Sequence, residues 1–132
     1  MNDVNSVIDK SSDAVDSARY EVEYPGLLQR TREHLPNVQL VLCEPFILPV
    51  GRTKERYPEW SAEIKKRQES VVRLSIEFNG VYVNFQDAFN DAIEKAPLEY
   101  WMWNGIHPMP AGHQLMANHW TETVHKSVSF IK

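Results

Sequence analysis

The fold is decided by the apolar run Val38-Gln39-Leu40-Val41-Leu42-Cys43. It has the length of a strand and almost no polar residues, which is typical of a strand buried on both faces of a parallel sheet. The stretch that follows, Glu44-Pro45-Phe46-Ile47-Leu48-Pro49-Val50-Gly51, carries prolines that a central strand excludes. It is therefore expected to form a loop at the carboxyl end of the strand, where parallel sheets bind their ligands.

A helix and a second strand are expected after this loop. Within residues 58–78, apolar side chains recur at helical spacings, at Trp60, Ile64, Val71, Leu74 and Phe78. Asn79-Gly80 is the stop signal of that helix, and Val81-Tyr82-Val83-Asn84-Phe85 is the predicted second strand. A short helix over residues 86–95, a loop over residues 97–110 and a terminal helix from Ala111 onward follow.

The N-terminal part is harder to assign. Residues 1–13 are polar, rich in serine and aspartate, and without a sustained period. Ser12 or Asp13 is expected to cap a helix over residues 14–35. Pro25 lies inside that helix, where a proline removes one hydrogen bond at a cost of about 3 kcal/mol, so the sequence predicts a kink or a split near Tyr24.

The alternation of helices and strands predicts one α/β domain over residues 1–132, with a parallel sheet covered by helices. Only two strands are evident, and a sheet of that size leaves an unpaired edge at residues 38–43. Self-association through this strand edge is therefore expected.

Composition limits the partners. A net charge of −4, with Lys65-Lys66-Arg67 as the one basic cluster, argues against nucleic acid and anionic membranes as partners, and the cluster is expected to be a solvated helix face. No stretch approaches the roughly 18 apolar residues of a membrane span, and the start lacks a signal peptide. These features predict a soluble protein; its compartment stays open, with the cytoplasm slightly favoured. The single cysteine, Cys43, is expected to be buried as a small hydrophobe.

One loop carries the chemistry. In Trp103-Asn104-Gly105-Ile106-His107-Pro108-Met109-Pro110-Ala111-Gly112-His113, a histidine sits between prolines just before a helix. Together with residues 40–46, Gln68 and Val83-Asn84-Phe85-Gln86, this block resembles the SGNH (GDSL-type) esterases and lipases. The resemblance implies a three-layer αβα, flavodoxin-like SGNH-hydrolase fold. It also implies acyl transfer from a small-molecule or carbohydrate ester to water, with no metal and no organic cofactor.

By this resemblance His107 is the general base, and the residue three positions earlier orients its imidazole. The family has an aspartate there, whereas this chain has Asn104, which carries no charge. The amide oxygen of Asn104 can accept the imidazole hydrogen, but its NH₂ end can equally favour the wrong tautomer. Glu99, Asp87, Asp91 or a bare Ser-His pair are the alternatives.

The front of the family pattern is incomplete. Asn2-Asp3-Val4 matches the end of the family's Gly-x-Asn-Asp block, which implies that Asn2 is an oxyanion donor. The Gly-Asp-Ser block is absent, and Ser17, although it follows Asp16, lies in a helical pattern. The resemblance thus implies an N-terminally truncated domain that lacks its first strands, roughly 70–90 residues and the nucleophile, and is inactive alone.

Two further interpretations stay open for the whole chain. It is a catalytically inactive, esterase-like binding or structural module that pairs with another chain, or Met1 is an internal codon of a longer reading frame. Trp101 and Trp103 either line an acyl or sugar pocket or anchor the loop to the core.

The histidines at positions 107, 113, 119 and 125 do not suggest a metal site. Six residues of helix advance about 600°, so His113, His119 and His125 point in three directions. His113 is expected to pack against the loop at the helix start, and His119 and His125 are expected to be exposed.

Overall fold

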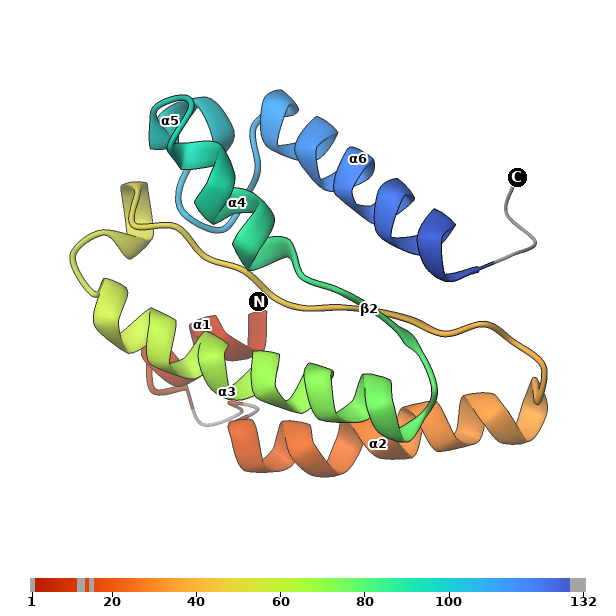
Figure 1. Ribbon diagram of the computed structural model, residues 1–132. Coiled ribbons are helices and arrows are strands. Elements are labelled where there is room, and N and C mark those ends of the chain that lie inside the picture. Colours follow the sequence, from red (N-terminus) through yellow and green to blue (C-terminus); the bar gives the residue numbers. More distant parts are fainter. Residues whose placement is uncertain (1, 12–13, 15, 129–132) are drawn as a thin grey trace.

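A short parallel sheet lies between two layers of helices (Figure 1). The computed structural model describes residues 2–11, 14 and 16–128, with the side chains of Asn2 and Asp3 outside that description. Of the described helices, one layer contains α1 (Asn2–Ile8), α2 (Ser17–His34) and α3 (Tyr57–Glu77). The other contains α4 (Phe85–Ile93), α5 (Leu98–Trp101) and α6 (Pro110–Ser127). The three-layer αβα arrangement is therefore confirmed.

Within the described residues the sheet consists of β1 (Val41–Cys43) and β2 (Val81–Val83), paired in parallel with Leu42 opposite Tyr82. Both strands are shorter than predicted. β2 ends early because the side-chain oxygen of Asn84 accepts the backbone N–H of Asp87 at 2.9 Å and so caps α4. The end of the predicted second strand is thus the start of a helix.

The outer edge of β1 has no neighbouring strand among the described residues. Leu40 and Glu44 form their backbone hydrogen bonds with β2, at 2.9 and 3.1 Å, so alternation directs the N–H and C=O groups of Val41 and Cys43 to the other side. Leu42 is buried, but Cys43 is exposed. The predictions of a strand buried on both faces and of a buried cysteine are therefore wrong, because nothing described covers this edge.

Helix α2 differs from its prediction at both its start and its middle. The predicted caps, Ser12 and Asp13, lie outside the described residues, and Asp16 caps the helix by accepting the backbone N–H of Arg19 at 2.8 Å. The helix then continues through Pro25 to its end, so the predicted split is wrong. Tertiary packing explains this: Leu28 is buried against α3, which offsets the hydrogen bond that the proline removes.

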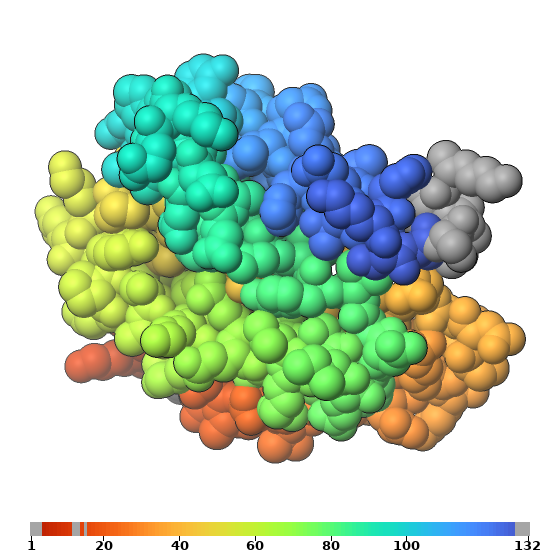
Figure 2. Space-filling model, viewed as in Figure 1, coloured from red at the N-terminus to blue at the C-terminus, as the bar shows by residue number. Residues whose placement is uncertain are grey.

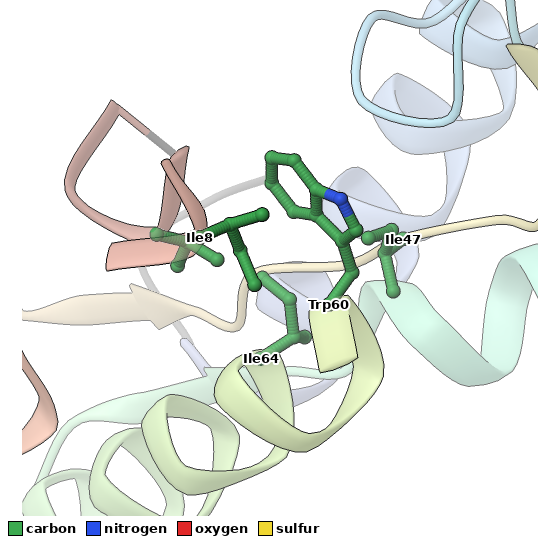
Figure 3. Close-up of a cluster of buried hydrophobic side chains, with 5 residues drawn as sticks. Ile8, Ile47, Trp60 and Ile64 are labelled. Carbon is green, nitrogen blue, oxygen red and sulfur yellow. The ribbon is translucent and has the colours of Figure 1, made fainter. Parts of the chain in front are cut away.

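Helix α1 was not expected, because residues 1–13 lack a sustained period. Val4 and Ile8 lie one helical turn apart, and both side chains are buried in a cluster with Ile47, Trp60 and Ile64. Figure 3 shows Ile8 beside these three residues. Two apolar residues are too few for a recognisable pattern, so only the cluster they join makes the helix evident.

Helix α3 follows the predicted periodicity but buries one charge. Arg67 is only 2% exposed; its Nη1 donates to the backbone oxygen and the side-chain Oε2 of Glu63, both at 3.0 Å, and its guanidinium lies 5.6 Å from the ring centre of Tyr20. The prediction that Lys65-Lys66-Arg67 is a solvated face therefore fails at Arg67. Arginine can be buried here because the carboxylate and the ring replace its water.

The helices of the other layer enclose a second apolar core. Val124 and Val128 pack on Val83 and Phe85, so the end of α6 is fixed to the sheet. None of the helices in the described part of the chain is both long and apolar enough to span a bilayer.

Replacement of Trp60 by alanine tests how α1 is held. Trp60 is 2% exposed in the α1–α3 cluster, so its loss is expected to lower the free energy of unfolding by about 3–5 kcal/mol. Trp103→Ala is the matched control, because that side chain is 69% exposed. Urea denaturation measures both. Equal effects of the two substitutions would contradict the assigned packing.

Candidate active site

The loop that carries His107 is closed by its own backbone. Met102 and Pro108 form an antiparallel bridge, and the N–H of Trp103 donates to the carbonyl of His107 at 2.9 Å. Gly105 lies at the tip with a φ of +85°, a left-handed conformation that favours glycine. The short helix α5 precedes this loop and α6 follows it, so both ends are anchored.

The same loop is seated on the segment after β1. The N–H of Leu48 donates to the carbonyl of Gly105 at 3.1 Å. A Cβ on Gly105 would lie 2.0 Å from Thr53 Oγ1, and one on Gly51 would lie 2.7 Å from the Cα of Asn104. The absence of two side chains therefore lets the histidine loop pack directly on residues 48–53, beyond the carboxyl end of the sheet.

Two glutamines hold this supporting segment in place. Gln68 Nε2 donates to the carbonyl of Pro45 at 2.8 Å. Gln86 accepts the N–H of Ile47 at 2.9 Å and donates to its carbonyl at 3.1 Å. Both glutamines belong to the blocks that carry the family resemblance, and the structure gives each a role in fixing the loop.

Asn104 contacts His107 in a defined orientation. Its Oδ1 accepts the backbone N–H groups of Ile106 and His107 at 3.2 and 3.0 Å and lies 3.1 Å from His107 Nδ1. Because two backbone donors require an acceptor at this position, the atom facing the imidazole is the oxygen and not the NH₂ group. The hydrogen of the neutral ring then lies on Nδ1, and Nε2 is the nitrogen that can take up a proton.

The two tryptophans beside Asn104 have different roles in the packing. Trp101 is half-buried, and its indole N–H donates to the carbonyl of Ala96 at 3.2 Å. Trp103 is 69% exposed, with its ring centre 6.2 Å from that of His107. Anchoring the loop therefore falls to Trp101, while Trp103 offers an open aromatic surface next to the histidine.

The other residues considered from the sequence lie elsewhere. None of Glu99, Asp87 and Asp91 hydrogen-bonds to His107 among the described contacts; Asp87 accepts from Asn84 Nδ2 at 2.6 Å. The side chain of Asn2 lies outside the described residues. Helix α1 nevertheless reaches the loop, because Ile106 packs on the cluster that holds Val4 and Ile8.

The histidines of α6 do not gather around His107. His113 is exposed in the first turn of α6, so its predicted packing against the loop is wrong. His119 is half-buried, with its ring 6.2 Å from that of Phe85, rather than exposed, and His125 is exposed as predicted. Within residues 2–11, 14 and 16–128, no group of three metal-binding side chains is found.

Sequence reasoning missed Glu44, the residue directly after β1. It is 5% exposed, accepts the backbone N–H of Gln86 at 2.8 Å, and accepts the hydroxyl of Tyr82. Burial raises the pKa of Glu44, partly offset by these hydrogen bonds. Its carboxyl group links the end of β1 to the start of α4. The sequence signal that could have identified this residue is a glutamate directly after an apolar run.

Comparison with known proteins identifies the family. Residues 1–115 match the sequence profile of the GDSL-like Lipase/Acylhydrolase family, so the chain belongs to that family. No match is found among curated proteins.

This chain matches little more than half the length of each of three solved structures of similar fold. A structure from Parabacteroides merdae, assigned as a GDSL-like lipase, is 38% identical and superposes with a TM-score of 0.86 over 95% of this chain and 56% of its own. An alpha/beta hydrolase from the metagenome of Lake Arreo is 23% identical, with a TM-score of 0.79, over 94% of this chain and 56% of its own. An acetylxylan esterase from Geobacillus stearothermophilus is 24% identical, with a TM-score of 0.75, over 93% of this chain and 55% of its own. The last two share the fold alone.

The tautomer of His107 can be measured by ¹⁵N NMR of the imidazole nitrogens above the pH at which the ring is protonated. The native chain is expected to carry the hydrogen on Nδ1 because Asn104 Oδ1 accepts it. Asn104→Ala is expected to shift the population toward the Nε2-protonated form, and Asn104→Asp, which keeps the acceptor, to preserve the native form. An Asn104→Ala spectrum identical to the native one would contradict this orientation.

The burial of Glu44 predicts a pH effect of definite sign. Because its folded pKa is raised, its stabilising contribution is complete below the unfolded pKa of about 4.3 and is lost as the pH rises through the folded pKa. Glu44→Gln stays neutral, so relative to the native chain its free energy of unfolding is expected to rise between pH 4 and pH 8.

Urea denaturation at each pH measures the free energy of unfolding. Glu59→Gln is the control, and the opposite pH dependence is expected for it. The hydrogen bond from Arg56 lowers the pKa of Glu59, so the native advantage over that variant is lost as the pH falls. Parallel pH profiles for the two variants would show that Glu44 is not desolvated.

Proposed function

We propose that this chain supplies the base side of a carboxylic-ester hydrolase site, with His107 as the general base. The hydrogen bond between His107 Nδ1 and Asn104 Oδ1 carries the proposal, because it leaves Nε2 of an exposed imidazole free to accept a proton. Membership of the GDSL-like family supports the reaction class.

The reaction has two steps of acyl transfer. A serine oxygen attacks the ester carbonyl carbon while Nε2 of His107 takes the hydroxyl proton, and the same nitrogen returns that proton to the departing alcohol. Water then attacks the acyl-serine by the same route and releases the acid. His107 is unchanged at the end of the cycle.

Asn104 is proposed to orient His107 without stabilising its charge. In serine proteases the loss of this carboxylate lowers turnover by about 10⁴-fold because the wrong tautomer forms. Here the two backbone donors hold Oδ1 toward the ring, so the tautomer is retained and only the charge is missing. A charged hydrogen bond is worth about 1–1.5 kcal/mol more than a neutral one, so the loss is about tenfold.

The nucleophile is proposed to come from polypeptide outside these 132 residues. The chain spans about 56% of the length of the similar Parabacteroides merdae structure, and the open edge of β1 is where a further strand can pair. Asn2 is the proposed oxyanion donor, and the packing of α1 near Ile106 supports this. A preorganised donor contributes about 2.7–4 kcal/mol to transition-state stabilisation.

The proposed substrate is a small-molecule or carbohydrate ester. The exposed ring of Trp103 next to His107 supports this class, because an aromatic face binds the apolar side of an acyl group or of a sugar ring. The second candidate function is an inactive binding or structural module, and it is favoured by one observation, the uncharged Asn104 at the position of the family's carboxylate.

A chimera separates the two functions. The segment of the Parabacteroides merdae protein that precedes its matched region is fused before Met1, and hydrolysis of p-nitrophenyl acetate is measured. The chain alone is expected to show no His107-dependent rate, and the chimera is expected to be active. His107→Ala should then lower the chimera's rate by about 10²–10⁴-fold, and Asn104→Asp should raise it about tenfold.

His113→Ala is the control in this assay, because that histidine is exposed in α6 and makes no contact with Asn104 among the described hydrogen bonds. A chimera that unfolds cooperatively but shows no rate dependent on His107 would favour the binding module. A His107-dependent rate in the unfused chain would overturn the proposed external nucleophile.

A further inference from the structure

The outer face of α3 carries an apolar strip that the described residues leave uncovered. A groove of about 730 Å³ runs along α3 and is bounded on its other side by Tyr82 and Asp87. Val72 and Ile76 line it and are 39% and 77% exposed. In Figure 2, α3 forms the green lower front of the molecule, open to solvent. Exposed aliphatic side chains at helical spacing, next to a groove, are typical of a docking surface.

The charges beside this strip alternate with a fixed spacing. Lys65, Glu69, Arg73 and Glu77 follow one another four residues apart, so they form one ridge on the surface of α3. Arg73 pairs with Glu21 at 3.2 Å and with Glu77 at 3.5 Å, both on the exposed surface. In the part of the chain that the structure describes, Lys65 and Glu69 form no ion pair.

This order of charges is complementary to itself when it is reversed. In an antiparallel second helix of the same sequence, Lys65 lies level with Glu77 of the second copy, and Glu69 lies level with Arg73 of the second copy. A shift of one helical turn, or a parallel arrangement in register, brings like charges together. Among arrangements related by a two-fold axis, the antiparallel one in this register is therefore favoured, because it alone places all four charges of the ridge level with opposite charges of a second copy.

We propose that two copies of this chain associate through the outer faces of antiparallel α3 helices, about a two-fold axis that passes close to the exposed Val72. Val72 then lies next to the axis, and Ile76 is covered by the aliphatic stem of Lys65 and by Ala62 of the second copy. The interface uses the β2 side of the sheet. It leaves the β1 edge and the His107 loop free, so it is independent of the proposed function.

A pair of charge reversals tests the interface by sedimentation velocity. Glu69→Lys alone and Arg73→Glu alone each place like charges together twice across the two-fold axis. Each is expected to weaken dimerisation by about tenfold or more. An equimolar mixture of the two variants restores both pairs, so a heterodimer is expected to form at native affinity or tighter.

Glu122→Lys on the exposed surface of α6 is the matched control and should leave dimerisation unchanged. Circular dichroism establishes that each variant is folded. Three results would overturn the proposal: a native chain that stays monomeric at high micromolar concentration, dimers that Glu69→Lys does not weaken, or a mixture that fails to recover. Persistence of dimers in Glu69→Lys would assign self-association to another surface, including the β1 edge.

Discussion

The parallel pairing of β1 with β2 is the constraint on which the structure depends. Two parallel strands cannot be joined by a tight turn, so the chain must return across the sheet through α3. This crossover buries Trp60 and Ile64 against α1 and Leu74 against β1, and it brings the carboxyl ends of both strands to the same side. The loop after β1 and the start of α4 meet there, linked by Glu44.

The conformation of the His107 loop depends more on the segment after β1, on which it packs, than on the loop's own sequence. Gly51 and Gly105 permit a backbone contact that side chains would prevent, and Gln68 and Gln86 fix the segment underneath. An amide at position 104 can orient His107 in this setting because backbone N–H groups, and not a charge, decide which of its ends faces the ring. Preorganised dipoles thus replace one function of a carboxylate, while its stabilisation of the imidazolium is absent.

Helices and strands were predicted correctly from hydrophobic periodicity wherever the periodic stretch was long enough. Helix α3, with buried residues from Trp60 to Leu74, is placed to within one residue of its predicted bounds, and the predicted strands and helices occur in the expected order. The structure adds α1, and it adds α5 within the predicted loop over residues 97–110. Helix α1 was not predicted because its apolar pattern consists of only two residues, Val4 and Ile8, one helical turn apart. Arg67 is buried because Tyr20 packs on it, and Cys43 is exposed because its strand has no further neighbour among the described residues. Neither fact is a property of the local sequence. Burial of a single residue depends on what packs across from it.

By itself the sequence determined the αβα fold, the family and the loop that carries Asn104 and His107, because periodicity and a rare motif are local properties. Only the tertiary structure decided which end of the Asn104 amide faces the imidazole, and it separated the anchoring Trp101 from the exposed Trp103. It also joined α1 to the loop through Ile106. The first two depend on hydrogen bonds that form only once the loop has its folded geometry. The third depends on packing between segments distant along the chain, and no local pattern encodes either.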